Sequence, residues 1–177
     1  MGEDHQSLRH WYDALSGSYD ELYGQEQAAK HDAILKLLEC PRFQTFVDVG
    51  CGTGRFLESV SQHFTQSVGI DVSGEMLRIA KSRIFKNEVE FVRAASPWLP
   101  LRDNVADCIV SISLIELGAS TGTHIDEFER LRTTLGILAV TVFGLQLALE
   151  RRWGQRVKRS RIGRRENLYV ITKEDLD

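Results

Sequence analysis

Cysteine, proline and long apolar runs are all scarce in this chain, and each shortage excludes a class of protein. The three cysteines are odd in number and show no CxxC spacing, so neither a disulfide scaffold nor a zinc knuckle is expected. Three prolines in 177 residues exclude a proline-rich fibre. No apolar run approaches the ~20 residues of a membrane helix, and the acidic start lacks the features of a signal peptide. We therefore expect a protein of the reducing cytoplasm without a membrane span.

The chain does contain an ordinary apolar fraction and an uneven distribution of charge. Hydrophobic residues make up 42% of the sequence, which allows one domain of this length to bury a core without disulfides. The net charge is −3, yet residues 1–150 hold 13 Lys and Arg against 21 Asp and Glu. Residues 151–177 hold 9 against 4, so an acidic body precedes a basic segment.

Short apolar runs alternate with amphipathic stretches along most of the chain. Five runs have the pattern of buried strands, at residues 45–50, 67–72, 89–92, 107–114 and 137–143. Residues 8–23 are expected to form one or two short helices with an aromatic face, and four further stretches have helical spacing, at residues 28–39, 55–64, 74–84 and 124–135. Strands separated by helices predict βαβ units, and runs that are apolar throughout predict a parallel sheet buried on both faces. We expect an α/β fold: a Rossmann-like, doubly wound, mostly parallel sheet with helices on both faces.

The most informative segment is the run Asp48-Val-Gly50-Cys-Gly52-Thr-Gly54, which ends the first predicted strand. Open α/β sheets bind their ligands at this end of the strands. Glycines there permit a tight turn and a close approach of the ligand, and the following helix offers free N–H groups to an anion. The spacing is GxGxG, whereas the dinucleotide fingerprint GxGxxG needs a glycine where this chain has Arg55.

Two acidic residues indicate which nucleotide this turn accepts. Asp48 precedes Gly50 by two residues, where a carboxylate would repel a pyrophosphate and attract an α-ammonium group. Asp71 ends the second predicted strand, 21 residues after Gly50, a spacing that suits a carboxylate bonded to ribose hydroxyls. A zwitterionic ligand that carries a ribose points to S-adenosylmethionine.

Three segments also carry a family resemblance. They are Asp48-Val-Gly-Cys-Gly-Thr-Gly54, Gly69-Ile-Asp-Val-Ser-Gly-Glu-Met-Leu77 and Asp107-Cys-Ile-Val-Ser-Ile-Ser-Leu-Ile-Glu-Leu117. Together they resemble the class I S-adenosylmethionine-dependent methyltransferases, most closely the small-molecule branch that includes the ubiquinone/menaquinone-biosynthesis enzymes. The resemblance extends over residues 12–143 and implies a methyltransferase that acts on a small molecule. A Rossmann-like domain that binds another nucleotide, or none, is the alternative.

The resemblance implies a role for each matching residue. Asp48 and the glycine backbone resemble the grip on the methionine part, and Asp71 resembles the ribose acid. Val72 and Met76 are expected to cover the adenine, with burial of Met76 in an ordinary helix core as the alternative. Tyrosines near the N-terminus resemble those that fold over the cofactor, or they only pack their helix on the sheet. The predicted cofactor-binding residues are Tyr12, Tyr19, Asp48, Gly50, Cys51, Gly52, Gly54, Asp71, Val72, Met76, Ala94, Ala95, Ser111 and Ile112.

The sequence departs from the family pattern at the expected adenine site. Arg93-Ala94-Ala95 replaces the family's Gly-Asp-Ala, so the usual acceptor for the adenine amino group is missing or is replaced, for example by Ser96. Trp98 is expected either to stack on the adenine edge or to fill the core.

The sequence also lacks the family's histidine after the fourth strand, where Leu117 stands instead. Glu116 and His124 are then the candidate catalytic bases by position, although a structural or solvated role suits each of them better. The five histidines are scattered without HxH or HxxxH spacing, so no metal is expected.

Residues 151–165 form the basic segment, with eight Lys or Arg among fifteen residues. The simpler interpretation is a solvated helix face that balances the acidic body. The functional interpretation is an element that binds phosphates of RNA, of an anionic lipid surface or of a substrate. Three functions stay open: a small-molecule methyltransferase, an RNA or protein methyltransferase that docks through this segment, and a non-catalytic S-adenosylmethionine-binding partner.

We expect the whole chain, residues 1–177, to form one domain. It would consist of a helical cap, a cofactor-binding core and a basic substrate-side segment, at residues 1–40, 45–143 and 144–177. The family's sheet has seven strands, the last two in a hairpin after strand five. Residues 168–171 are expected to form strand six, so the sheet is expected to lack a final helix and strand. The edge left open would need cover, for which a second subunit in a homodimer is a candidate.

Overall fold

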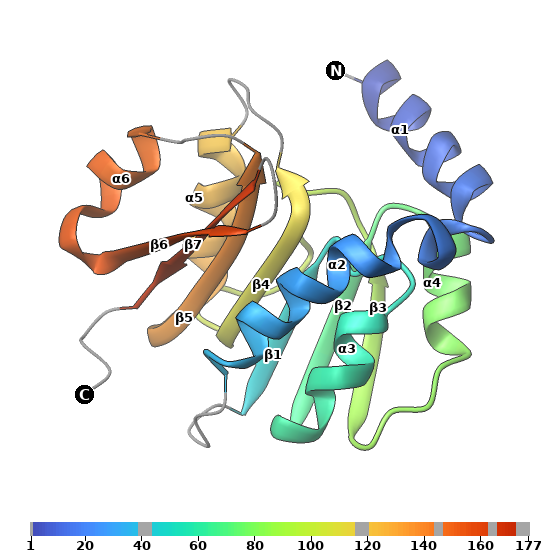
Figure 1. Cartoon of the computed structure of the whole chain (residues 1–177), viewed down its shortest axis with the longest axis horizontal. Coiled ribbons are helices and arrows are strands. Elements are labelled where there is room, and N and C mark those ends of the chain that lie inside the picture. The colour runs from blue at the N-terminus through green and yellow to red at the C-terminus, as the bar shows by residue number, and fades with distance from the viewer. Residues whose placement is uncertain (1, 39–43, 116–120, 144–146, 163–165, 173–177) are drawn as a thin grey trace.

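The computed structural model describes residues 2–38, 44–115, 121–143, 147–162 and 166–172. A seven-stranded sheet carries helices on both faces (Figure 1). The strands are β1 (Thr45–Val49), β2 (Gln66–Asp71), β3 (Glu88–Arg93), β4 (Ala106–Ile115), β5 (Arg132–Phe143), β6 (Val157–Ile162) and β7 (Glu166–Ile171). The helices are α1 (Gly2–Leu15), α2 (Tyr19–Leu35), α3 (Arg55–Val60), α4 (Gly74–Lys81), α5 (Thr121–Leu131) and α6 (Leu147–Trp153), with short 3-10 turns η1 (Ser61–His63) and η2 (Gly154–Arg156).

The strand order across the sheet is β3-β2-β1-β4-β5-β7-β6. Strands β1 to β5 pair in parallel, whereas β7 is antiparallel to both β5 and β6. The predicted doubly wound α/β sheet is therefore confirmed. The chain builds outward from β1 to β3 and then returns to place β4 on the other side of β1. This reversal puts the topological switch point between β1 and β4, at the carboxyl ends of the strands.

The prediction that the sheet would lack a strand was wrong. Strand β6 (Val157–Ile162) lies within the basic segment. The strand that contains residues 168–171 is therefore β7, the seventh strand in chain order and not the sixth. Four of the six residues of β6 are exposed, and Lys and Arg suit such an edge because they oppose pairing with another chain. A solvated edge strand has no apolar alternation, which is the pattern that identifies strands in a sequence. The argument for a covering second subunit no longer applies.

The helix boundaries also differ from those predicted, and the helices expected at residues 55–64 and 74–84 end at Val60 and Lys81. The helix expected at residues 28–39 begins earlier, as part of α2, and the helix expected at residues 124–135 ends at Leu131. Strand β5 begins at the next residue, so Leu135 belongs to a strand and is 71% exposed instead of facing the core. The predicted cap of α4 is confirmed, because the hydroxyl of Ser73 accepts a hydrogen bond from the backbone N–H of Met76 at 3.1 Å.

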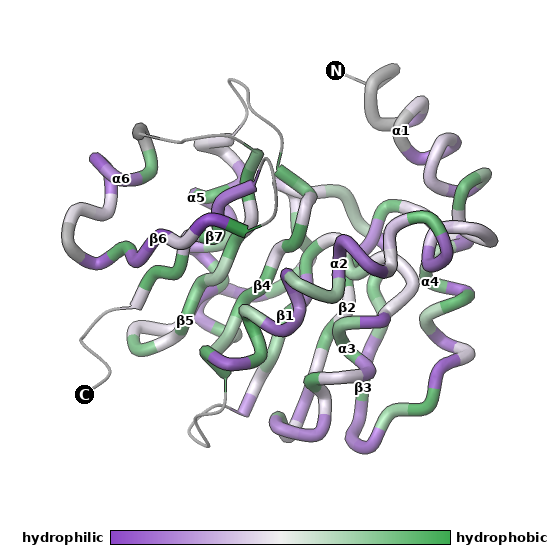
Figure 2. The backbone as a smooth tube through the Cα atoms, in the orientation of Figure 1, coloured by the Kyte–Doolittle hydropathy of each residue, from purple (hydrophilic) through white to green (hydrophobic). Residues whose placement is uncertain are grey.

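Apolar side chains pack against both faces of the sheet, and the hydrophobic colour in Figure 2 runs along the central strands β4 and β5. One face packs against α5 and α6 through residues such as Phe128 and Trp153. The other face packs against α2, α3 and α4 through residues such as Ile34, Leu57 and Leu77. In Figure 1, α2 and α3 lie in front of the sheet and α5 lies behind it.

Candidate active site

The turn after β1 has the backbone that its glycines predict. Gly50, Gly52 and Gly54 have φ angles of 82°, 53° and 74°, in the left-handed region that side chains rarely adopt. A Cβ at Gly54 would lie 2.9 Å from the Cβ of Ala80, so the turn also packs closely against α4. The backbone N–H of Gly50 donates to the carbonyl oxygen of Ile70 at 2.8 Å, which joins the turn to β2. The ends of β1 and β2 therefore form one continuous surface.

Asp48 lies on β1 directly beneath this turn and is 2% exposed. Its carboxyl group accepts no hydrogen bond from any residue that the structure describes. Burial raises the pKa of Asp48 to about 8, and the negative charge of Asp71 adds to the shift. A buried carboxylate without donors is costly to ionise, and a cationic group on a ligand offsets that cost. The side chain is thus suited to an α-ammonium group.

Asp71 ends β2 and is held by backbone donors. Its Oδ2 accepts from the N–H of Gly52 at 2.9 Å, and its Oδ1 accepts from the N–H of Ser73 at 2.8 Å. Burial raises the pKa of Asp71, while these backbone hydrogen bonds act in the opposite direction. Each carboxylate oxygen has two lone pairs, so both oxygens can still accept a hydrogen bond from a ribose hydroxyl.

A pocket opens between the glycine turn and α2. Six of the fourteen predicted cofactor-binding residues line it, and these are Tyr19, Asp48, Gly50, Cys51, Gly52 and Ile112. They come from α2, from β1 with its turn, and from β4, so the pocket lies at the switch point of the sheet. The structure therefore brings these six predicted residues together in one pocket, and their cofactor-binding roles stay predictions.

The other eight predicted residues lie outside this pocket: Tyr12, Gly54, Asp71, Val72, Met76, Ala94, Ala95 and Ser111. The ring centroids of Tyr12 and Tyr19 are 6.4 Å apart, and the N–H of Ala94 donates to the carbonyl of Asp71 at 3.1 Å. Met76 is 1% exposed in the core, as its alternative interpretation predicted. The buried hydroxyl of Ser111 has no hydrogen-bond partner within the described part of the chain. The cofactor-binding roles of these eight residues stay predictions.

Helix α2 contributes one wall of the pocket, which the sequence motifs did not indicate. Asp20, Gly24, Gln27 and His31 line the pocket from one face of this helix. Their spacing of four, three and four residues is that of a single helix face, so a helical projection of residues 19–35 would have grouped them. Arg55, at the start of α3, also lines the pocket. In the sequence it was noted only because it stands where the GxGxxG fingerprint needs a glycine.

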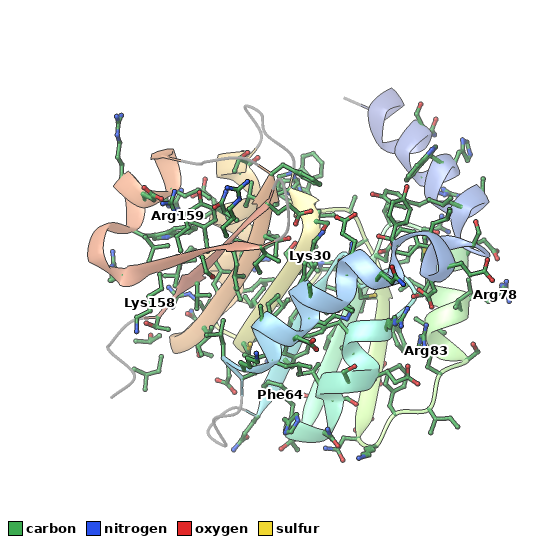
Figure 3. All side chains as sticks on the ribbon, in the orientation of Figure 1. Lys30, Phe64, Arg78, Arg83, Lys158 and Arg159 are labelled. Carbon is green, nitrogen blue, oxygen red and sulfur yellow. The ribbon has the colours of Figure 1, made fainter. Side chains whose placement is uncertain are left out.

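Helix α2 is attached to the sheet on both sides of the pocket. On one side, Asp20 accepts a hydrogen bond from the hydroxyl of Thr53 at 2.7 Å and forms an ion pair with Arg83 at 2.5 Å. On the other side, the ammonium of Lys30 donates to Glu166 of β7 at 2.6 Å. Figure 3 shows Lys30 between α2 and β4, and Arg83 near the other end of α2. The helix therefore forms a fixed roof over the pocket.

The end of β4 next to this roof is irregular. Ser113 has a φ of 57°, which is uncommon for a residue other than glycine, and the β4–β5 register shifts between Ser111 and Ile115. The N–H of Ser113 donates to the hydroxyl of Thr141 at 2.7 Å, and its own hydroxyl accepts from Lys30 at 2.8 Å. Such bulges redirect side chains at the ends of strands, often beside active sites.

The two candidate bases are not brought into the pocket by the described structure. Glu116 lies outside the described residues. His124 does not line the pocket, and its Nδ1 lies 2.7 Å from the hydroxyl of Ser96. Ser96 thus has a partner already, and its role toward adenine stays a prediction. Trp98 is 63% exposed, so the expectation that it fills the core was wrong, while stacking on adenine stays a prediction.

The described residues contain neither a cluster suited to a metal ion nor a helix suited to a membrane. No group of three His, Cys, Asp or Glu side chains among them is placed to hold a metal ion. None of the described helices is long and apolar enough to cross a membrane. Cys51 and Cys108 are buried free thiols, and burial raises the pKa of each.

Comparison with known proteins identifies the family. A family model described as "Methyltransferase domain" matches residues 47–140, which are more than half of the chain. The chain belongs to this methyltransferase domain family. The chain thus carries a class I S-adenosylmethionine-dependent methyltransferase domain, as its sheet order and the glycine turn also indicate.

Two curated relatives match parts of this chain. MJ1252 of Methanocaldococcus jannaschii is 32% identical over 106 residues, which are 59% of this chain and 39% of that protein. The 18S rRNA (guanine-N(7))-methyltransferase RID2 of Arabidopsis thaliana is 32% identical over 95 residues, 51% of this chain and 32% of that enzyme. The methyltransferase therefore spans less than half the length of these relatives.

A solved structure shows the same fold over the full length. Magnesium protoporphyrin IX methyltransferase ChlM from Synechocystis PCC 6803, with bound S-adenosylmethionine, superposes with a TM-score of 0.76. The match covers 98% of this chain and 99% of that chain, at 14% identity, and it concerns the fold alone. The cofactor of the methyltransferase is S-adenosylmethionine. Its residues fit that cofactor, because the left-handed glycine turn leaves space for a ligand and Asp48 offers a carboxyl group without a donor.

Proposed function

We propose that this methyltransferase transfers the methyl group of S-adenosylmethionine to a small-molecule acceptor. The observation that carries the proposal is the position of α2 over the pocket. Ion pairs of Asp20 and Lys30 hold this helix in place near its two ends. A pocket covered by a fixed helix suits a small acceptor better than a nucleotide within a folded RNA.

The chemistry asks little of the protein beyond positioning. The bound cofactor supplies a methyl group on a sulfonium, which is already activated for displacement. The chain must hold the acceptor in line with that methyl group and exclude water. Burial lowers the pKa of His31 to about 4, and the charge of Arg55 contributes, so the imidazole on the pocket wall is neutral at pH 7.

Transfer of a labelled methyl group tests the acceptor class. The purified chain is incubated with methyl-labelled S-adenosylmethionine and a cell extract separated into small-molecule, RNA and protein fractions. We expect label in the small-molecule fraction. Label confined to RNA or protein would contradict the proposal.

The binding of S-adenosylhomocysteine, the product with the same amino-acid part, should release a proton through Asp48. At pH 7 a carboxyl group with a pKa of about 8 is mostly protonated, and a nearby ammonium group lowers that pKa. Affinity should therefore rise with pH up to about 8, by at most about tenfold per pH unit. Calorimetry in buffers of different ionisation enthalpy measures the released proton.

Two comparisons isolate the contribution of Asp48. Asp48→Asn should abolish the release, and 5′-methylthioadenosine, which lacks the ammonium group, should release no proton from the wild type. Equal release by the variant and the wild type would show that another group titrates.

An RNA acceptor, bound through residues 151–165, is the second candidate, favoured by the similarity to RID2. Figure 3 shows Lys158 and Arg159 on β6, at the far edge of the sheet from β1. Within the described residues, Arg152 pairs with Asp126 at 2.5 Å and Arg159 with Glu150 at 3.2 Å, so part of the basic charge is neutralised internally. Binding of RNA that weakens steeply with salt, and is lost when these arginines are replaced, would support this candidate.

A further inference from the structure

We propose that Arg55 binds the α-carboxylate of the cofactor's methionine part, with the imidazole of His31 beside it. This assignment rests on the use of S-adenosylmethionine in the same pocket. Arg55 would act as a positioning residue, because it holds the cofactor by the end opposite the adenosine.

Some charged side chains of the pocket have ion-pair partners among the described residues and others have none, and the unpaired ones suit a zwitterion. Asp20 is already paired with Arg83 and Thr53. Asp48 has no donor, and the guanidinium of Arg55 has no hydrogen bond or ion pair among the described residues. The pocket thus presents one unpaired acid and one unpaired cation. An amino acid group carries the complementary pair, an ammonium for Asp48 and a carboxylate for Arg55.

The guanidinium of Arg55 lies against helix α2. Arg55 directly follows Gly54 and begins α3, while its side chain crosses to Gly24 of α2. A Cβ at Gly24 would collide with Nη1 of Arg55, so this glycine makes room for the guanidinium beneath the roof. The side chain therefore lies where the turn and α2 meet, at the border of the pocket.

His31 lies on the same wall. It is on the pocket-lining face of α2, its ring is 4.9 Å from that of Phe56, and the charge of Arg55 acts on it. A neutral imidazole offers one N–H donor, and a guanidinium offers a planar fork that matches a carboxylate. Together they form a donor set for an anion within the pocket that Asp48 also lines.

Two nucleosides distinguish this role from general damage to the site. S-adenosylhomocysteine carries the amino acid group, and 5′-methylthioadenosine is a thioether that lacks it. Calorimetric titration of the full chain with Arg55→Met should show S-adenosylhomocysteine bound about 10- to 100-fold more weakly, the range for a lost charge-assisted hydrogen bond. The affinity for 5′-methylthioadenosine should stay within about twofold.

The control is Arg151→Met, which removes the same charge from an exposed position on α6. It should leave both affinities unchanged, whereas Arg55→Lys should retain part of the affinity for S-adenosylhomocysteine. A second measurement follows His31 by NMR: S-adenosylhomocysteine should raise its pKa, and 5′-methylthioadenosine should not.

Other outcomes overturn the assignment in distinguishable ways. Equal weakening of both nucleosides by Arg55→Met, or no weakening of either, would reject the carboxylate contact and leave the cofactor assignment intact. Failure of the wild type to bind either nucleoside would reject the contact and the proposed function together.

Discussion

Replacing Lys30 with methionine should lower the free energy of unfolding by about 3–5 kcal/mol, the cost of leaving one partner of a buried ion pair alone. The side chains of Lys30 and Glu166 are 2% and 3% exposed, and their charged atoms lie 2.6 Å apart. Methionine keeps the length and shape of the lysine stem but offers no donor. In the variant, the carboxylate of Glu166 keeps a hydrogen bond to Ser113 and loses its counter-ion. Urea denaturation at neutral pH measures the loss.

Two further variants separate the charge from the packing. The double variant Lys30→Met with Glu166→Gln removes both charges and should recover a large part of the lost stability. Glu26→Gln removes the other carboxylate near Lys30, which is 59% exposed, and should cost less than about 1 kcal/mol. A loss below about 1 kcal/mol for Lys30→Met would show that the pair does not hold α2 on the sheet.

Replacing Asp71 with alanine should weaken binding of S-adenosylhomocysteine by about 100-fold or more. Two hydrogen bonds from ribose hydroxyls to a carboxylate contribute about 1.5–3 kcal/mol each, and the variant loses both. It also frees the N–H of Gly52 and of Ser73, which Asp71 now fixes at 2.9 and 2.8 Å. Calorimetric titration measures the affinity, and Asp71→Asn should be intermediate because it keeps one acceptor oxygen.

Asp107 provides a matched control at the other end of the strands. Its Oδ2 accepts from the backbone N–H of Gln44 and of Thr45 at 3.0 and 3.1 Å, much as Asp71 accepts from its turn. Asp107→Ala should lower stability and leave the affinity within about twofold, since it lies at the start of β4, away from the carboxyl ends. Unchanged affinity in Asp71→Ala would reject the placement of the ribose.

These two predictions concern the two parts that build the pocket. Lys30 holds α2 against β7 and is not a predicted cofactor contact. Asp71 holds the glycine turn on the opposite side of the pocket. A variant of Lys30 should therefore act first on stability, and a variant of Asp71 first on affinity.

The sequence by itself predicted the glycine turn and the two acidic residues proposed to bind the cofactor. The GxGxG turn and Asp48 are local in sequence, and Asp71 ends the next strand, so a single βαβ unit places all three. The parallel order of the first five strands followed for a similar reason, since apolar runs separated by amphipathic helices permit few other topologies. The single-domain assignment stays a prediction.

Tertiary structure alone decided the opposite wall and the far edge of the sheet. Gln27, His31 and Arg55 meet in one pocket because α2 crosses the ends of the strands, which no local pattern encodes. Strand β6 was missed because its exposed basic side chains lack apolar alternation, and Leu135 lies within β5 although its spacing fitted a helix. The Lys30–Glu166 pair joins residues 136 positions apart. Contacts between residues so far apart in sequence depend on the tertiary fold. No local sequence pattern could therefore predict them.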